Sequence, residues 1–405
     1  MNPSSQQIIS VGCFAIIFLL AACAAPTPIP TLAPVEPTAI PTRAPTGTVA
    51  ITPTQIAPTL APTFNSPIVG TLLGNLANGA RVERIANTDF ATTLAFTQDG
   101  RIFYTEKNTG NLRVIENGRI VNEVVVHLDT EPTGERGFLS VALDPNFATN
   151  NALWIYHTLP GTPTEDEVVR VTLAGNRATK TESVFRSPNP GVAANHNGGI
   201  LQFGPDGMLY LVIGEHAQVA LAQDLSKIPG KLHRFAPTIP LTPAPGNPFA
   251  NSSVYAYGIR NSFGYDFDPV SGKIFMTING PECDDLVVLV LPGSDHGWRP
   301  NIRCGDANPN YFKPLLPLLR IEKPIAPTQL TFYRGALFAE WKNDLFFCAA
   351  NDQTMRHVKL NAARDQFASL ETLPRNPVPC MLDVKTGLDG ALWFTDNRAI
   401  YRIGR

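Results

Sequence analysis

The chain has 405 residues, a formal net charge of −2 and no cluster of Lys or Arg. Near-neutral charge without a basic patch argues against binding to a nucleic-acid backbone. The body that follows the N-terminal segments has about 340 residues, which exceeds a typical single-core domain and suits a propeller, in which each blade adds its own sheet.

The chain begins with an apolar run, residues 8–22, that ends in the sequence Leu20-Ala21-Ala22-Cys23. Small residues ahead of a cysteine are the processing signature of a bacterial lipoprotein signal. We therefore expect residues 1–23 to be a signal segment, Cys23 to carry lipid, and the mature protein to be held on the outer face of a bacterial membrane by lipid alone. No Lys or Arg precedes the apolar run, so an uncleaved anchor is the alternative.

Residues 24–66 are dominated by Pro, Thr and Ala and carry few charges. This composition is too poor in large apolar side chains to bury a core, and it favours extended polyproline conformations. We interpret the segment as a disordered linker, a stalk that carries the domain formed by residues 67–405.

Alternating apolar residues, a turn with Asp, Asn or Gly, and a second apolar strand recur six times in the body. The six units begin at Leu94, Val141, Leu201, Tyr265, Ala336 and Val384. Spacings of roughly 45 to 75 residues leave room for four strands each, which predicts an all-β, six-bladed β-propeller. Residues 400–403 would complete a blade begun near residues 81–85. Two separate β-sandwiches are the alternative.

The third unit contains a histidine beside two glycines. His196 precedes Gly198 and Gly199, and Glu215 ends the next strand of the same hairpin. Imidazole titrates near neutrality, so His196 is a candidate general base, and Glu215 is a candidate to orient its ring. A hydrogen-bonding loop residue is the alternative role for His196.

Two further groups carry chemistry. Residues 280–285 read Gly-Pro-Glu-Cys-Asp-Asp, and hard cations such as calcium prefer carboxylate and backbone carbonyl oxygens. Arg260 and Asn261 offer a donor fork and an amide suited to anionic or carbonyl-bearing ligands. The alternative for residues 280–285 is a solvated loop tip. The alternative for Arg260 and Asn261 is an ordinary salt bridge between blades.

Four cysteines remain once Cys13 and Cys23 are assigned to the signal segment: Cys283, Cys304, Cys348 and Cys380. An even remainder in an exported protein predicts two disulfides. Three pairings are possible, and we favour Cys283 with Cys304 because the loop between them is short. Zinc ligation is the rival, but the chain has no CxxC spacing.

Taken in order, several segments resemble the soluble quinoprotein glucose/sorbosone dehydrogenase family. They include GERGFLSVALDPNF, NHNGGILQFGPDGMLYLVIGE, YGIRNSFGYDFDP, NGPECDD and LDVKTGLDGALWFTD. The resemblance covers most of the chain after about residue 85. It implies an enzyme that oxidises an aldose sugar with pyrroloquinoline quinone and calcium on a six-bladed propeller and passes the electrons to an external acceptor.

The resemblance also implies roles for individual residues. His196 matches the base that removes the proton of the anomeric hydroxyl while hydride passes to the quinone. Glu135 and Asn195 match positions beside the substrate, and Arg260 and Asn261 match positions beside the quinone. The carbonyls of Gly280 and Pro281 match those that reach calcium, which would polarise the quinone.

The chain departs from the family pattern near its C-terminus. Met381 and Leu382 stand where quinone-binding members often carry one or two arginines, and a quinone with three carboxylates needs cationic partners. Arg334, Arg356 and Arg375 are the candidates to replace them. Two other functions stay open: a non-catalytic propeller that binds carbohydrate or a surface partner, and a calcium-dependent hydrolase or lactonase.

Overall fold

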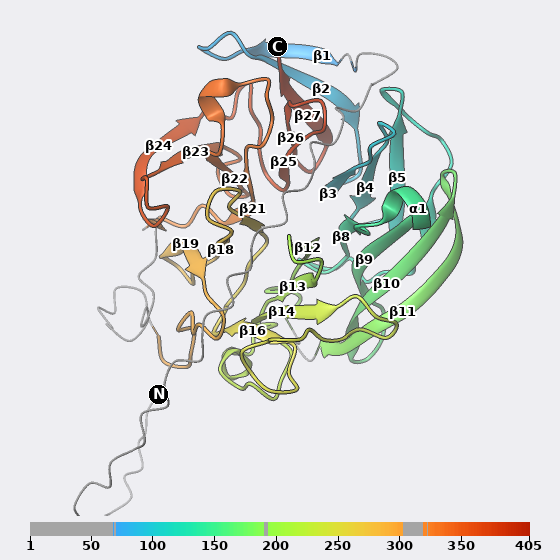
Figure 1. The fold of residues 1–405 in the computed structure, drawn as a ribbon, viewed down its shortest axis with the longest axis vertical. Helices are drawn as coiled ribbons and strands as arrows, with labels where there is room; N and C mark the ends of the chain where they lie inside the picture. Colours follow the sequence, from blue (N-terminus) through green and yellow to red (C-terminus); the bar gives the residue numbers. More distant parts are fainter. Residues whose placement is uncertain (1–67, 69, 190–192, 303–318, 322) are drawn as a thin grey trace, which may run out of the picture. The chain divides into compact units, whose positions relative to one another are not determined.

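Six antiparallel sheets lie around a central axis as the blades of a β-propeller (Figure 1). The computed structural model describes residues 68, 70–189, 193–302, 319–321 and 323–405, which fall within one compact unit. The predicted signal segment, the linker and Cys23 lie outside the described residues. The prediction of an all-β, six-bladed propeller is confirmed.

Each blade begins with an inner strand beside the axis and continues outward. The first blade consists of β3 (Ala91–Phe96), β4 (Ile102–Glu106), β5 (Asn111–Glu116), β6 (Arg119–Ile120) and β7 (Val126–His127). The second blade consists of β8 (Phe138–Leu143), β9 (Ala152–Leu159), β10 (Thr164–Ala174) and β11 (Arg177–Asn189). The third blade consists of β12 (Gly198–Phe203), β13 (Leu209–Ile213), β14 (Lys231–Ala236), β15 (Thr242–Pro243) and β16 (Val254–Tyr257). The fourth blade consists of β17 (Tyr265–Phe267), β18 (Ile274–Ile278), β19 (Asp285–Val290) and β20 (Leu319–Ile321). The fifth blade consists of β21 (Pro327–Phe332), β22 (Leu345–Ala349), β23 (Met355–Leu360) and β24 (Phe367–Leu373).

The last blade joins the two ends of the domain. Its strands are β25 (Val384–Thr386), β26 (Leu392–Thr395), β27 (Ala399–Gly404), β2 (Arg81–Asn87) and β1 (Thr71–Asn75). Strand β2 pairs with β27, so that Val82 lies opposite Ile403, and both side chains are fully buried. Figure 1 shows the N-terminal strands in blue beside the C-terminal strands in red. The predicted closure of the ring is confirmed.

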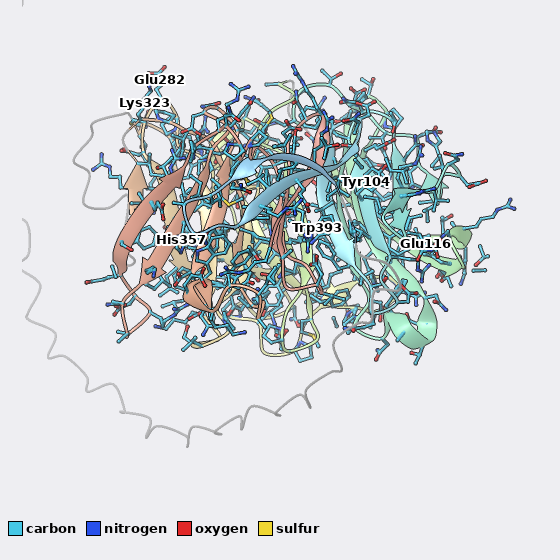
Figure 2. The ribbon with its side chains drawn as sticks, turned by 90° about the horizontal axis from the view of Figure 1, so that it is seen from above. Tyr104, Glu116, Glu282, Lys323, His357 and Trp393 are labelled. Carbon is cyan, nitrogen blue, oxygen red and sulfur yellow. A yellow bond between two sulfur atoms is a disulfide. The ribbon has the colours of Figure 1, made fainter. Side chains whose placement is uncertain are left out.

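Apolar side chains fill the spaces between blades. Trp154 of β9 packs edge-on against Phe203 of β12, with ring centroids 6.0 Å apart. Tyr104 of β4 and Trp393 of β26 are buried in one cluster that joins the first and last blades, while Glu282 and Lys323 are exposed (Figure 2). Since both faces of the central strands are covered, these strands are rich in consecutive apolar residues rather than strictly alternating.

The hairpin turns explain why the repeats were visible in the sequence. In three units an Asp-Gly pair connects the first two strands, and Gly100, Gly207 and Gly390 take φ of 86°, 73° and 77°. Glycine reaches this left-handed region without the steric penalty of a side chain.

The fifth unit begins earlier than the sequence pattern predicted. Its inner strand is β21, Pro327–Phe332, whereas residues 339–341 form the short 3-10 helix η2 (Ala339–Trp341). Phe338 and Trp341 mimic a strand pattern because both are buried. The other described helices are also short: α1 (Phe147–Asn150) and η1 (Val219–Ala222). Among the described residues, no helix is long and apolar enough to cross a bilayer.

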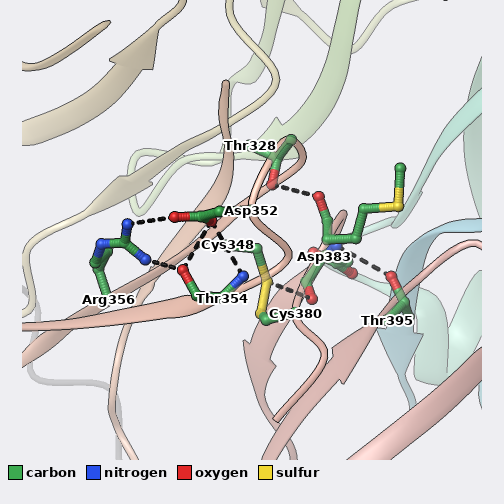
Figure 3. The surroundings of a disulfide bond; sticks show 9 residues. Thr328, Cys348, Asp352, Thr354, Arg356, Cys380, Asp383 and Thr395 are labelled. Atoms are coloured by element: carbon green, nitrogen blue, oxygen red, sulfur yellow. Dashed lines mark hydrogen bonds and ion pairs between the residues drawn. A yellow bond between two sulfur atoms is a disulfide. The ribbon is translucent and has the colours of Figure 1, made fainter. Parts of the chain in front are cut away.

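A disulfide joins Cys348 of β22 to Cys380, and the two Cα atoms lie 5.0 Å apart (Figure 3). This pairing is the one left over if Cys283 pairs with Cys304, and it rules out zinc ligation by these two sulfurs. Cys283 is disulfide-bonded as well. Its expected partner Cys304 lies outside the described residues.

Candidate active site

A cavity of about 250 Å³ lies on the axis at the end of the ring where the inner strands begin. All six blades contribute to its wall, through Lys107, Glu135, Gly198, Asn279, Thr328 and the pair Met381 and Leu382. The segments that precede the inner strands and those that follow the second strands meet at this end. Residues far apart in the sequence are therefore brought together here.

His196 and Glu215 form a close carboxylate–imidazole pair next to this cavity. His196 precedes β12 and Glu215 follows β13 of the same hairpin. Nδ1 of His196 lies 2.6 Å from Oε1 of Glu215, and the two side chains are 11% and 1% exposed. A carboxylate accepts hydrogen bonds only, so this contact assigns the ring proton to Nδ1 and leaves the lone pair on Nε2. The sequence-based prediction that Glu215 orients His196 agrees with this geometry.

Glu135 connects the pair to the cavity wall. Its Oε2 accepts hydrogen bonds from the backbone N–H of His196 at 2.6 Å and from the amide of Asn261 at 3.0 Å. Asn261 is itself held, because its Oδ1 accepts the N–H of Gly198 at 3.1 Å. Residues from three consecutive blades thus form one bonded cluster around the backbone of His196.

The close approach of the two turns depends on a glycine. A Cβ on Gly214 would lie 2.2 Å from the carbonyl oxygen of His196. The N–H of His216, two residues later, donates to this same oxygen at 3.1 Å. A larger residue at position 214 would therefore push Glu215 away from the ring.

Two predicted site residues, Asn195 and Arg260, are not among the residues that line the cavity. Asn195 precedes His196 and is half-buried, and its Oδ1 is buried with no hydrogen-bond partner among the described residues. Arg260 donates through Nη1 to the carbonyl of Asn279 at 3.1 Å and lies over Trp298, 5.4 Å from the ring centroid. Arg260 is therefore behind the wall rather than among the residues that line the cavity.

The two aspartates of the acidic loop are occupied by protein partners. Asp284 forms an ion pair with Arg320 at 2.5 Å. Asp285 accepts hydrogen bonds from three backbone N–H groups, those of Gly280, Ile325 and Ala326. Burial raises the pKa of Asp285, and these N–H groups act against that rise. Both carboxylates have structural partners, so calcium ligands in this loop would have to be backbone carbonyls.

Backbone carbonyls do converge beside Gly280. A Cβ there would lie 2.0 Å from the carbonyl oxygen of Cys283 and 2.5 Å from that of Asp284. Carbonyl oxygens are suitable donors for calcium, but the carbonyls that approach Gly280 are those of Cys283 and Asp284, whereas the resemblance implies those of Gly280 and Pro281. Among the described residues, no group of three or more His, Cys, Asp or Glu side chains is placed to hold a metal.

Lys107 is a cavity residue that sequence reasoning missed. It follows β4, is 7% exposed, and donates through Nζ to the carbonyl of Pro132 at 2.8 Å. Burial lowers the pKa of Lys107, and the charges of Glu135 and Glu131 oppose that shift. A signal was present, since Lys107 stands just after the second strand of its repeat, as Glu215 and Asn279 do in theirs.

Arg334, Arg356 and Arg375, the candidates to replace the family's arginines, are not among the described residues that line this cavity. Arg334 pairs with Asp266 at the opposite end of the axis, where a second cavity of about 920 Å³ lies. Arg356 pairs with Asp352, and Arg375 lines a separate pocket with Asp396 and Arg398 of the last blade. Their positions follow from strand register, which a single sequence does not show.

The cavity fits a planar quinone ring and one of its carboxylates. Phe90, Leu139, Phe263 and Met381 offer apolar walls, and Asn279 has a buried Oδ1 without a hydrogen-bond partner among the described residues. Lys107 is the one cationic side chain among the described lining residues. The carbonyl of Met381 accepts a hydrogen bond from Thr328 at 3.0 Å, which fixes the apolar wall at 381–382 (Figure 3).

Comparison with known proteins points to one family of sugar dehydrogenases. The sequence profile of the family described as Glucose / Sorbosone dehydrogenase matches residues 88–403. Aldose sugar dehydrogenase YliI of Escherichia coli (strain K12) is 27% identical over 337 residues, which cover 76% of this chain and 88% of that protein. Quinoprotein glucose dehydrogenase B of Acinetobacter calcoaceticus is 26% identical over 286 residues, 63% of this chain and 56% of that protein. A solved oxidoreductase described as a glucose dehydrogenase, from Thermus thermophilus, is 30% identical with a TM-score of 0.69, covering 80% of this chain and 100% of that one.

Proposed function

Because the chain belongs to the glucose/sorbosone dehydrogenase family, we propose that it oxidises an aldose sugar at its anomeric carbon. The observation that carries this proposal is the His196–Glu215 pair, 2.6 Å apart beside a cavity to which every blade contributes. The names of two sequence relatives, an aldose sugar dehydrogenase and a quinoprotein glucose dehydrogenase, support the same reaction class.

In this reaction the residues of the chain hold the sugar and move one proton. Nε2 of His196 accepts the proton of the anomeric hydroxyl as hydride leaves the adjacent carbon, so that the aldose becomes a lactone. Glu215 keeps the ring in the required tautomer and stabilises the imidazolium that forms. Glu135 and Asn195 lie beside His196 and offer hydrogen-bond acceptors to sugar hydroxyls.

The hydride acceptor that we propose is pyrroloquinoline quinone, assisted by calcium. When bound, the quinone supplies the two-electron acceptor, and an external acceptor then receives the electrons. Lys107 would hold one carboxylate, the apolar wall would contact the ring, and Asn261 and Arg260 would support the adjacent backbone. Calcium would be held by the carbonyls of Gly280 and Pro281.

The test is sugar-dependent dye reduction by purified protein supplied with pyrroloquinoline quinone and calcium. Replacing His196 with Ala should lower kcat by about 10² to 10⁴ because general-base catalysis is lost, while quinone affinity stays within about threefold. Equal loss of turnover and quinone affinity would instead assign His196 a structural role. Wild-type protein that binds sugar but neither binds quinone nor reduces dye would favour a non-catalytic carbohydrate-binding module. Metal-dependent ring opening without dye reduction would favour a lactonase.

We also propose that the protein is exported and anchored through lipid on Cys23. The small residues before this cysteine support the proposal. Mass spectrometry of the mature N-terminus should find a diacylglyceryl-modified cysteine at position 23, and a Cys23→Ala variant should be released from membranes. An intact residue 1–23 segment in mature protein would contradict it.

A further inference from the structure

A fully buried carboxylate of the neighbouring blade lies behind the His196–Glu215 pair. Asp166, on β10, is 0% exposed. Its Oδ2 lies 3.0 Å from Nε2 of His216, which is also 0% exposed, but the two atoms do not have the geometry of a hydrogen bond. Its Oδ1 accepts hydrogen bonds from Thr158 and from Asn189, each at 3.2 Å. Asp166 is not among the residues that line the cavity.

Asp166 is connected to both members of the pair through the residues that follow them. One connection runs through Asn189, whose Nδ2 also donates to Oδ1 of Asn197 at 2.8 Å. Asn197 follows His196 in the chain. The other is the close contact between Asp166 and the ring of His216, the residue that follows Glu215. A single carboxylate thus anchors the two turns from which the imidazole and its partner project.

The turns at His196 and His216 have an uncommon backbone conformation that depends on support from neighbouring residues. His196 and His216 take φ of 60° and 54°, and Ala217 takes 56°. Left-handed φ is uncommon for residues other than glycine and persists only where the surroundings hold it. The backbone bond from His216 to the carbonyl of His196 then couples the two turns.

We propose that Asp166 is a positioning residue, which keeps the imidazole of His196 against the carboxylate of Glu215 by anchoring Asn197 and His216 across the boundary between two blades. It acts through these neighbours and not on the substrate. Its effect on turnover rests on the proposed function, whereas its effect on the His196–Glu215 contact does not.

The same strand offers a matched control. Glu167 is the next residue of β10 and pairs with His157 at 3.0 Å, with side chains 6% and 1% exposed. Successive residues of a strand point to opposite faces, so Glu167 lies on the other face of the sheet from Asp166. Its second partner is Arg186, at 2.8 Å, and the polar contacts of His157 and Arg186 among the described residues do not include the His196 turn. Glu167→Gln therefore removes a buried carboxylate–histidine pair of the same kind without touching the proposed anchor.

The first readout needs neither sugar nor quinone. In protein labelled with ¹⁵N-histidine, the Nδ1 proton of His196 should give a signal in slow exchange with water, identified by its loss in His196→Gln. We expect Asp166→Asn to speed that exchange at least about tenfold and Glu167→Gln to leave it unchanged. With active enzyme, Asp166→Asn should lower kcat by about 10- to 100-fold with KM within about threefold, because a displacement on the order of 1 Å has that cost.

The exchange rates of the two variants decide whether Asp166 positions His196. Equal exchange in Asp166→Asn and Glu167→Gln would overturn the proposal and leave Asp166 a merely structural residue. Faster exchange in Asp166→Asn alone would support it, even if no sugar is oxidised, in which case the proposed function fails and the positioning role stands. If Asp166→Asn does not fold, Asn189→Ala breaks one connection at an uncharged residue. It should raise the exchange rate severalfold, and an unchanged rate would overturn the proposal.

Discussion

Lys107 and Glu135 give the central cavity its charge. The ammonium group of Lys107 lies 5.4 Å from the ring centroid of Phe90 and is close enough to Glu135 for their charges to interact. On the part of the wall that the last blade contributes, next to the blade of Lys107, Met381 and Leu382 offer no charge. One lysine balanced by one glutamate suits a ligand with a single strongly bound anionic group, and it predicts modest affinity for a quinone with three carboxylates.

Substitutions at this wall should move quinone affinity in opposite directions. Lys107→Met should weaken binding of pyrroloquinoline quinone by about 10- to 100-fold, because a charge-assisted hydrogen bond contributes about 1.5 to 3 kcal/mol. Leu382→Arg should strengthen binding by a similar factor, since it adds a cation at the apolar wall. Equilibrium dialysis measures both.

Lys180→Met is the control for Lys107→Met. Lys180 is 63% exposed and pairs with Glu182 on the outer strand of its blade, so its loss should not change quinone affinity. Unchanged affinity in Lys107→Met would mean that the quinone, if bound, does not use this cation.

At the scale of the element, the Cys348–Cys380 disulfide joins the fifth blade to the loop before β25. The same loop carries Met381 and Leu382, so the crosslink also fixes part of the cavity wall. Sγ of Cys348 lies 3.4 Å from the carbonyl oxygen of Asp383 (Figure 3). The crosslink therefore acts on both the stability of the ring and the shape of the site.

Replacing both cysteines with alanine should destabilise the domain. The bond closes a loop between residues 32 positions apart, and loop-closure entropy then gives about 3 to 4 kcal/mol. Urea unfolding under non-reducing conditions should show this loss as a lower midpoint. A midpoint equal to that of the wild type would mean that the crosslink adds no net stability to the domain.

Local patterns revealed much of the fold, and contacts between blades account for what they missed. Alternating apolar residues and Asp-Gly turns predicted the sheets because both are properties of one hairpin. His196 and Glu215 were found for the same reason. Lys107 and Asp166 were not, since their importance depends on which blade lies beside them. The acidic run at 165–167 illustrates this, because strand register alone decides which of its carboxylates faces the His196 turn.

At the scale of the whole molecule, the propeller buries several ionisable side chains. His233 of β14 and His296 are both buried, and burial lowers the pKa of each to about 4. Burial favours the neutral ring of His233, and the hydrogen bond from its Nε2 to the carbonyl of Ile228 at 2.9 Å acts against this shift of the pKa. The folded protein therefore resists protonation at positions that the unfolded chain protonates readily.

This burial should make stability depend on pH below neutrality. The pKa of histidine falls from 6.5 in the unfolded chain to about 4 in the folded protein. The contribution of each histidine is thus complete above pH 6.5 and is lost as the pH falls towards 4, by up to about 3 kcal/mol each. Buried Asp285 and Asp383, whose pKa values are raised by burial, act in the opposite direction.

His296→Gln isolates one histidine: the difference in unfolding free energy between wild type and variant should shrink steadily from pH 6.5 to 4. His127→Gln, at a side chain that is 58% exposed, is the control for loss of a histidine at the surface. A constant difference for His296→Gln would mean that its ring takes up a proton as readily in the folded protein as in the unfolded chain.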